Sequence, residues 1–233
     1  MSSTNLVGMI SEVTLLVEKF GIRGAWLAML ASEIYSRPEY AYILRDKLFK
    51  GIKPLENRVL QGLTIGEIGV IYEYCVTLID PAARKGEGQF FTPDDVAEFL
   101  VKQTKEFPSG VWMDPCSGIG NLSWHLVNAQ KNKEKFISEN LIMMDKDELA
   151  LDIARVIFTI SFQRNVPDLF NRIKGSFIVF DFLSVADVGQ QAQLFGGDLL
   201  RIPKHDFVLV NPPYLATSKA DSRFELARCK DLY

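Results

Sequence analysis

The chain has 233 residues, of which 48% are hydrophobic and 24% are charged, and its formal net charge is −3 at pH 7. This composition is typical of a globular protein with a sizeable core, and the length suits one large domain or two small ones. The slightly acidic balance gives no overall electrostatic case for nucleic acid, although a local basic face would still provide phosphate contacts.

The few histidines and cysteines exclude several kinds of site. His125 and His205 are the only histidines, which excludes a histidine-rich metal site, and Cys75, Cys116 and Cys229 are too scattered to favour zinc or disulfides. The first ten residues lack the positive leader of a secretory signal, and no apolar run reaches membrane-spanning length. We therefore expect no metal, no membrane segment and a cytoplasmic location.

The first 85 residues predict a helical domain. Three segments carry apolar residues at helical spacing and are separated by glycines and prolines: EVTLLVEKF, GAWLAMLASEIY and EYAYILRDKLF. Thr64 and Glu67 have the spacing of a capping box, which predicts a further helix over residues 68–79. Nothing in this region indicates catalysis.

A second domain is predicted over residues 86–233, after a short polar hinge at residues 84–88. Strands there alternate with helices, which predicts a doubly wound, mostly parallel α/β sheet of the Rossmann type. The expected strands are 111–113, 141–144, 176–180 and 207–210, the helices are 93–106, 121–131 and 147–164, and residues 189–200 are an expected surface loop. In such sheets, ligands bind at the carboxyl ends of strands near the point at which strand order reverses.

The first of these strand ends begins the motif DPCSGIGNL. Gly118 and Gly120 allow a tight turn and a close approach of the backbone to a ligand, ahead of a helix. Asp114, on the last residue of the strand, is suited to accept a hydrogen bond from a ligand amine. Cys116 is a small residue that fits the turn, and no reactivity is expected of it. A plain strand-to-helix turn is the structural alternative.

Two further strands also end in acidic residues. Asp145 lies 25 residues after Gly120, where a carboxylate that binds ribose hydroxyls is expected. Asp181 is placed to accept a hydrogen bond from an exocyclic amine, and Phe182 to lie against an aromatic ring, although an aspartate after a strand is commonly a loop cap. The recurrence of an acidic strand end favours the functional interpretation.

Upstream of the glycine motif lies GQFFTPDDVAEFL. Thr92 and Pro93, followed by two aspartates, predict the start of a helix, whose free N–H groups suit a ligand carboxylate. Phe90 and Phe91 have a core role as the default, but one of them could face a cationic ligand through its ring.

In their order along the chain, GQFFTP, DPCSGIGNL, the strand-end Asp145, DF and NPPY resemble the S-adenosylmethionine-dependent methyltransferases that act on adenine N6 in DNA. The resemblance covers about residues 86–214 and is closest to the modification subunits of type I restriction systems, which also begin with a helical domain. It implies S-adenosylmethionine as cofactor, double-stranded DNA as substrate, and specificity and restriction subunits as candidate partners. One departure is Ile119, where the family usually has Ser or Thr, so that a hydroxyl contact would be missing. The implied cofactor-binding residues are Phe90, Phe91, Thr92, Pro93, Asp114, Cys116, Gly118, Gly120, Asn121, Leu122, Asp145, Asp181 and Phe182.

The catalytic residues implied by this resemblance are Asn211, Pro212, Pro213 and Tyr214. The side-chain oxygen of Asn211 and the rigidly held carbonyl of Pro212 would accept the two N–H bonds of adenine N6 and aim the nitrogen lone pair at the methyl donor. Tyr214 would stack on a base flipped out of the duplex. A proline-rich turn alone explains the prolines but neither the asparagine before them nor the tyrosine after them.

Two alternatives stay open. Methyltransferases of a glutamine in release factors, and of guanine N2 in ribosomal RNA, share NPPY, but the glutamine enzymes would show a PRPET-like stretch where this chain has GQFFTP. The chain ends about 20 residues after NPPY, and because a complete sheet of this class needs further strands, we expect the methyltransferase domain to be truncated. An inactive fragment that binds cofactor or a partner is therefore the second alternative.

Overall fold

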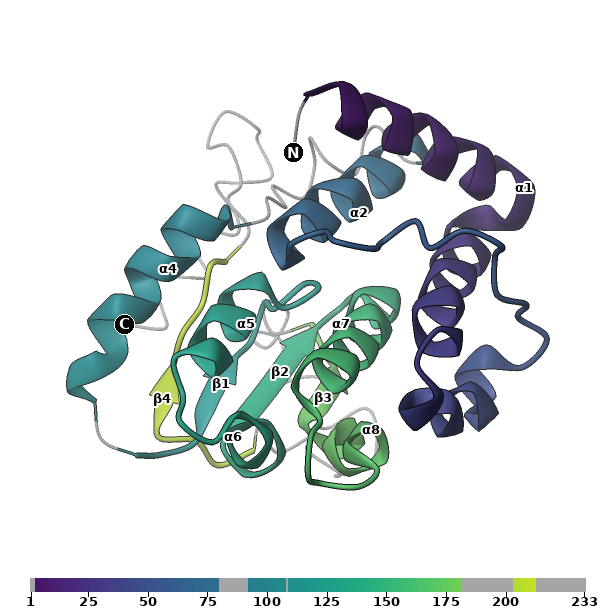
Figure 1. The fold of residues 1–233 in the computed structure, drawn as a ribbon. Helices are drawn as coiled ribbons and strands as arrows, with labels where there is room; N and C mark the ends of the chain where they lie inside the picture. Colours follow the sequence, from purple (N-terminus) through teal and green to yellow (C-terminus); the bar gives the residue numbers. More distant parts are fainter. Residues whose placement is uncertain (1–2, 80–91, 108, 182–202, 213–233) are drawn as a thin grey trace, which may run out of the picture.

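The computed structural model describes residues 3–79, 92–107, 109–181 and 203–212. In these residues a parallel four-stranded sheet is covered by helices, and a further group of helices, the helical part (residues 3–79), lies beside it (Figure 1). The fold is the expected α/β class with an incomplete Rossmann-like sheet and a helical N-terminal part. The predicted hinge at 84–88 and loop at 189–200 lie outside the described residues.

The helical part begins with a kinked helix. Helix α1 (Ser3–Tyr35) joins the first two predicted helical segments at Gly21, whose φ of 70° and ψ of 165° break the helix. The third predicted helical segment is helical but not α-helical, because residues 38–49 form two 3-10 helices, η1 (Pro38–Arg45) and η2 (Lys47–Phe49). Asp46 separates them in an extended conformation, and its side chain accepts the N–H of Leu48 at 2.9 Å.

Helix α2 (Ile65–Ile79) begins at the predicted capping box. The Thr64 N–H donates to Glu67 Oε2 at 2.9 Å, and the Glu67 N–H donates to Thr64 Oγ1 at 3.1 Å. The two bonds satisfy N–H groups that the helix itself leaves unpaired at its start.

The sheet confirms all four predicted strands within a few residues. They are β1 (Trp112–Asp114), β2 (Leu141–Asp145), β3 (Phe177–Val179) and β4 (Phe207–Val208). Their order is β3-β2-β1-β4, and every pair is parallel. Because β2 and β4 pair with opposite sides of β1, strand order reverses between β1 and β4, and this is the switch point at which a ligand is expected.

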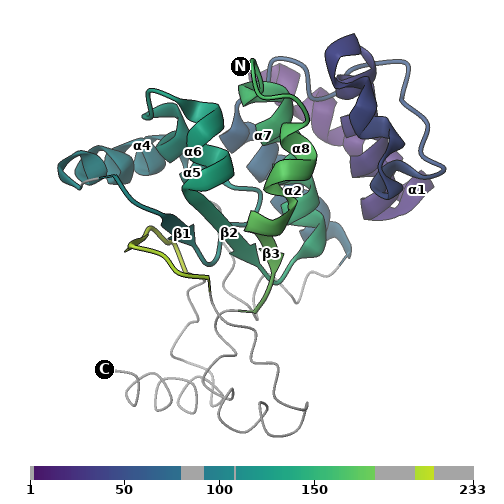
Figure 2. The same ribbon diagram turned by 90° about the horizontal axis from the view of Figure 1, so that it is seen from below.

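Helices α5, α6, α7 and α8 lie on one face of the sheet (Figure 2). Three helices occur where predicted, and Asp147 caps the last of them through hydrogen bonds to Leu149 and Ala150. Helix α6 was not predicted because its seven residues carry only two apolar side chains, Phe136 and Ile137. The bounds are α4 (Asp94–Gln103), η3 (Thr104–Glu106), α5 (Asn121–Asn128), α6 (Lys133–Glu139), α7 (Glu148–Phe162), α8 (Leu169–Arg172) and η4 (Ile173–Ser176).

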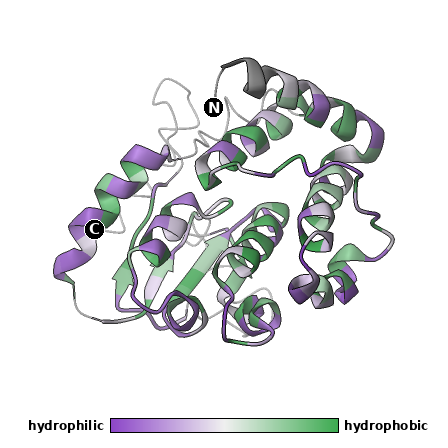
Figure 3. Cartoon of the chain, in the orientation of Figure 1, coloured by the Kyte–Doolittle hydropathy of each residue, from purple (hydrophilic) through white to green (hydrophobic). Residues whose placement is uncertain are grey.

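The strands are apolar on both faces, as expected for a sheet built into the interior (Figure 3). Leu141 and Met143 pack toward α5 and α7, whereas Ile142 and Met144 belong to a separate cluster with Met113. The helical part joins the fold through α7, since buried side chains of α1, α2 and α7 form one continuous core. This shared core holds the helical part against the layer of helices that covers the sheet.

Candidate active site

The described members of the predicted site gather around the carboxyl ends of the strands. Thr92 and Pro93 precede α4, Asp114 ends β1, Asp145 ends β2, and the remaining ones follow β1, β3 or β4 in the chain. Five predicted site residues lie outside the described residues: Phe90, Phe91, Phe182, Pro213 and Tyr214.

The turn after β1 fits closely against β2. The Ser117 N–H donates to the Met144 carbonyl at 2.9 Å, and the Gly120 N–H donates to the Ser117 carbonyl at 2.8 Å. Gly118 and Gly120 have φ values of 53° and 88°, which favour glycine. A Cβ on Gly120 would lie 2.6 Å from the Met143 methyl group and 2.9 Å from the Phe158 ring. Gly120 is thus required both by its backbone conformation and by the lack of space.

Asp114 is a buried carboxylate with one oxygen left open. Its side chain is 3% exposed, Ser123 Oγ donates to Oδ2 at 2.9 Å, and Oδ1 has no hydrogen-bond partner among the described residues. Burial raises the pKa of Asp114 to about 7, and the hydrogen bond from Ser123 and the nearby backbone N–H of Cys116 oppose this shift. An open, buried acceptor of this kind favours a ligand that brings a charged donor.

Asp145 is held differently, because both of its oxygens accept backbone N–H groups. Gly118 donates to Oδ2 at 2.6 Å and Asp147 donates to Oδ1 at 2.9 Å. Burial raises the pKa of Asp145, and these two bonds oppose the shift. The carboxylate ties the turn after β1 to the turn after β2, and its remaining lone pairs are those that a ligand hydroxyl would use.

Thr92 joins two asparagines that are far from it in sequence. Asn211 Nδ2 donates to Thr92 Oγ1 at 2.9 Å, and Asn121 Nδ2 donates to the Thr92 carbonyl. Asn121 is 3% exposed, and its Oδ1 has no partner within the described part of the chain. Since Asn211 donates through its amide nitrogen on one side, its amide oxygen is presented on the other.

Two further predicted residues, Cys116 and Leu122, and the departure from the motif at Ile119 lie in partly or fully buried places. Burial raises the pKa of Cys116 to about 12, with Asp114, Asp145 and Asp181 adding to the shift, so the thiol stays protonated near neutral pH. Leu122 packs in the core between α5 and the sheet, where its side chain supports the turn. Ile119, at which an expected hydroxyl residue is missing, is fully buried in the core shared with the helical part, where an apolar side chain fits.

Sequence reasoning missed the polar contacts that support the turn and the start of α4. Asp94 Oδ2 accepts the Thr64 hydroxyl at 3.0 Å, and Asp94 Oδ1 lies 3.1 Å from His125 Nε2. The Tyr72 hydroxyl donates to Asp147 Oδ2 at 2.5 Å. In sequence, Asp94 has the pattern of an ordinary first-turn carboxylate, and only the spacing of four residues between Asn121 and His125 hints that α5 presents both toward one segment.

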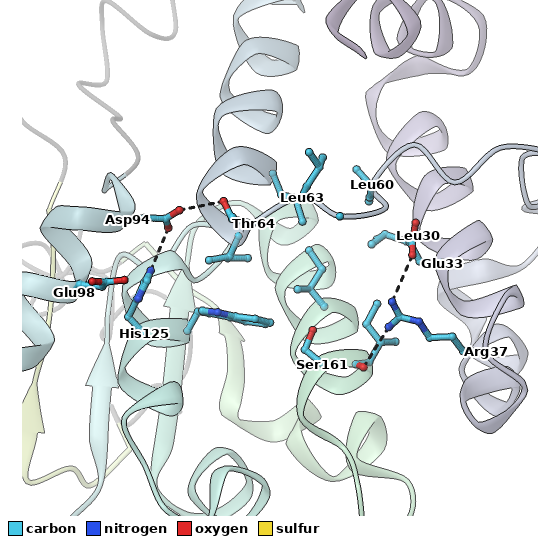
Figure 4. Close-up of a pocket in the computed structure, with 16 residues that line it drawn as sticks. Leu30, Glu33, Arg37, Leu60, Leu63, Thr64, Asp94, Glu98, His125 and Ser161 are labelled. Atoms are coloured by element: carbon cyan, nitrogen blue, oxygen red, sulfur yellow. Dashed lines mark hydrogen bonds and ion pairs between the residues drawn. The ribbon is translucent and has the colours of Figure 1, made fainter. Parts of the chain in front are cut away.

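A cavity of about 400 Å³ lies between the helical part and helices α4, α5 and α7 (Figure 4). Leu60 and Leu63 lie toward its middle in Figure 4, and polar groups lie at its ends, including the Asp94–Thr64 and Asp94–His125 contacts. None of the sequence-predicted site residues is among those that line it. The cavity is therefore separate from the candidate active site, although it meets the same segment at Asp94.

The described residues hold no group of three or more His, Cys, Asp or Glu side chains arranged to bind a metal ion. In the same residues, every helix is either too short or too polar to cross a membrane.

A family model described as N-6 DNA Methylase matches residues 64–230, which is well over half of the chain. The matched span begins at the capping box of α2 and includes every candidate site residue from Phe90 to Tyr214.

Proposed function

The chain belongs to the N-6 DNA Methylase family, and from this premise we propose that it transfers a methyl group from S-adenosylmethionine to adenine N6 in DNA. The observation that carries the proposal is the meeting of Asn211, Thr92 and Asn121 at the switch point of the sheet, beside a buried Asp114 with an open oxygen.

The residues around the turn fit S-adenosylmethionine. Asp114 Oδ1 and Asn121 Oδ1 are buried acceptors without a partner in the described residues, and the cofactor carries an ammonium group that would satisfy such acceptors. We propose that Asp114, the turn of Gly118 and Gly120, and the start of α4 at Thr92 hold its methionine end. Asp145 would accept its ribose hydroxyls, and Asp181 its adenine amine. When bound, the cofactor supplies an electrophilic methyl group on a sulfonium sulfur.

Asn211 and Pro212 would prepare the nucleophile. The N6 lone pair of adenine is delocalised into the ring, so the amine is a poor nucleophile unless acceptors on its N–H bonds favour a pyramidal nitrogen. The hydrogen bond from Asn211 Nδ2 to Thr92 supports this role, because it turns the amide oxygen away from Thr92 and leaves it free for a substrate N–H. Acceptors fixed in advance stabilise the charge that develops at nitrogen in the transition state.

The order of the motifs supports a narrower proposal. We infer that the chain acts as the modification component of a type I restriction system in the cytoplasm, with specificity and restriction subunits as partners. Pro213, Tyr214, Phe90, Phe91 and Phe182 stay predicted members of the site. The family match favours DNA over the glutamine and ribosomal RNA substrates of other enzymes that carry NPPY.

The proposal is tested by transfer of labelled methyl groups from S-adenosylmethionine to duplex DNA, followed by nucleoside analysis. We expect label in N6-methyladenine. Asn211→Ala should lower the transfer rate by about 100- to 1000-fold, as does the loss of one fixed polar group at other active sites, while cofactor affinity changes little.

Asn128→Ala is the matched control, because Asn128 is exposed at the end of α5 and its side chain accepts only from Lys133 in the described contacts. It should retain the wild-type rate. Label in release-factor protein or ribosomal RNA instead of adenine, or no saturable binding of the cofactor, would overturn the proposal.

A further inference from the structure

The segment Thr92–Asp94 is fixed at three points by two helices. Two side chains of α5, one helical turn apart, make hydrogen bonds to it: Asn121 with the Thr92 carbonyl, and His125 with the Asp94 carboxylate. Thr64, which caps the start of α2, makes the third contact, because its hydroxyl donates to the other Asp94 oxygen (Figure 4). The residues that contact Asp94 therefore come from both the helical part and the layer of helices on the sheet.

The link between Asp94 and Thr92 is stiff. Pro93 lies between them with φ of −59° and ψ of 151°, and its ring locks φ. The Pro93 carbonyl also accepts the Ala97 N–H at 2.9 Å, which ties the segment to α4. A shift of the Asp94 carboxylate is therefore passed to Thr92, whose hydroxyl accepts the amide of Asn211.

Asp94 also fits tightly against the first turn of α2. A Cβ on Gly66 would lie 2.5 Å from both carboxylate oxygens of Asp94, so only glycine leaves room for the side chain. A carboxylate is favoured there by the positive end of the helix dipole. The start of α2 thus provides three things for the Asp94 side chain of α4: the Thr64 hydroxyl, the positive end of the helix dipole, and the space left by Gly66.

We propose that Asp94 is a positioning residue for methyl transfer, which with Thr64 and His125 fixes Thr92 and, through it, the orientation of the Asn211 amide. The inference rests on the proposed function and gives the helical part a role in the chemistry: the start of α2 sets the geometry of the catalytic asparagine. Asp94 itself need touch neither cofactor nor DNA.

Gly66→Ala tests the proposal without weakening α2. Alanine has a higher helix propensity than glycine, so the helix gains stability while the new methyl group displaces Asp94. The first readout is the side-chain NH₂ signals of Asn121 and Asn211 by NMR in the protein alone. We expect the Asn211 NH₂ protons to exchange with solvent about five- to tenfold faster, as corresponds to the loss of one ordinary hydrogen bond.

The second readout is the kinetics of methyl transfer. We expect Gly66→Ala to lower kcat by about 10- to 100-fold, the cost of a small misplacement of a reacting group, with little change in KM for DNA. Gly8→Ala is the matched control, because it adds the same methyl group to a helix at a place where nothing lies within 4 Å. It should leave both readouts unchanged.

Two comparisons separate positioning from a general effect on folding. The double variant of Gly66→Ala with Asp94→Ala should be no slower than Asp94→Ala alone, because the displaced side chain is absent. Thr64→Ser should retain activity and Thr64→Val should lose it, while Glu67→Ala, which breaks the same capping box without removing the Thr64–Asp94 bond, should retain most of it.

Unchanged Asn211 signals in Gly66→Ala, or additive rate losses in the double variant, would overturn the positioning role. The NMR readout needs no activity, so it decides the inference even if the wild-type protein transfers no methyl group. That last outcome would count against the proposed function alone.

Discussion

The turns after β1 and β2 both begin with an aspartate at a strand end, but the two carboxylates have opposite surroundings. Both carboxylate oxygens of Asp145 accept hydrogen bonds from backbone N–H groups, those of Gly118 and Asp147. Asp114 is more deeply buried, accepts one hydroxyl from Ser123, and keeps Oδ1 without a partner in the described residues.

This difference separates two uses of one residue type. A carboxylate that accepts main-chain N–H groups fixes the path of the chain, and removing it leaves donors unpaired. A buried, ionised carboxylate with an open oxygen destabilises the folded protein, and the protein regains that free energy when the carboxylate takes up a proton or when a ligand supplies a donor. Asp145 is therefore first a structural residue that a ligand would share, whereas Asp114 has an oxygen that a ligand donor would satisfy.

The largest effect is expected at the glycine that lets the two turns touch. Gly120→Ala should lower the free energy of unfolding by about 2–5 kcal/mol, since it combines an unfavourable positive φ with overpacking against Met143 and Phe158. Urea denaturation measures this loss. Gly118→Ala is the comparison. It should lower the free energy of unfolding by about 1–2 kcal/mol, because alanine is unfavourable at the positive φ of this position. Equal losses would contradict the close contact of the first turn with β2.

Asp145→Ala should come next, with a loss of about 2–4 kcal/mol in the free energy of unfolding. The variant leaves the N–H groups of Gly118 and Asp147 without their acceptor, at about 1–2 kcal/mol each because both bonds are only partly buried. Asp114→Ala should cost clearly less at pH 8, because it removes a buried charge together with one hydrogen bond. If Asp114→Ala lowered the free energy of unfolding more than Asp145→Ala in urea denaturation, Asp145 would not be the structural carboxylate of the two.

The sheet was predictable because its strands are short apolar runs bounded by turn residues, and their alternation with helices allows few topologies. The strand-end aspartates followed from the same pattern. What separates Asp114 from Asp145 is not local: one is set by Ser123, nine positions away, and the other by the N–H of Gly118, 27 positions away.

The contacts around Thr92 were beyond sequence reasoning for the same reason. The Asn211–Thr92 bond joins residues 119 positions apart, and the Thr64–Asp94 bond crosses from the helical part to the helix that follows Pro93. Local patterns predicted a capping box and a helix start correctly, yet each of these residues also bonds to the other element. A pattern of a few residues predicts that a side chain caps the start of a helix, but it does not predict which distant group the same side chain also binds.

The pH dependence of stability should distinguish the two carboxylates further. Burial raises the pKa of Asp114 from 3.8 to about 7 in the folded protein, so the folded state binds this proton more tightly than the unfolded state. Its contribution therefore falls as pH rises from about 4 to about 7, and stays low above that. Between pH 5 and pH 8, the wild type should lose about 1–3 kcal/mol more than Asp114→Asn.

Unfolding free energies of the wild type and Asp114→Asn at several pH values measure this difference. The pKa of Asp145 is also raised by burial and acts in the same direction, but Asp145 is present in both proteins, so the difference between the two profiles reports on Asp114 together with its repulsion by Asp145. Parallel pH profiles would show that Asp114 is ionised in the folded protein over the whole range, and so that it is not a desolvated carboxylate.

The smallest effect is expected where the helical part supports the second turn. The Tyr72 hydroxyl donates to Asp147 Oδ2, while Asp147 Oδ1 caps α7 and the Asp147 N–H donates to Asp145. Burial raises the pKa of Tyr72, which keeps the phenol protonated as a donor. Tyr72→Phe should cost about 0.5–1.5 kcal/mol in the free energy of unfolding, the net value of one hydrogen bond.

Tyr74→Phe is the control on the same helix, because the Tyr74 hydroxyl meets only the neutral Thr14 hydroxyl, at 3.3 Å, in the described contacts. Hydrogen exchange gives the sharper readout. Loosening Asp147 should speed exchange of its own N–H and that of Gly118, because both donate to the Asp145 carboxylate, which is then held less firmly. Backbone N–H groups next to Asp114 should exchange as before. Equal acceleration at Gly118, at Asp147 and at the N–H groups next to Asp114 would mean that the helical part stabilises the whole edge of the sheet, and not the contacts of Asp145 in particular.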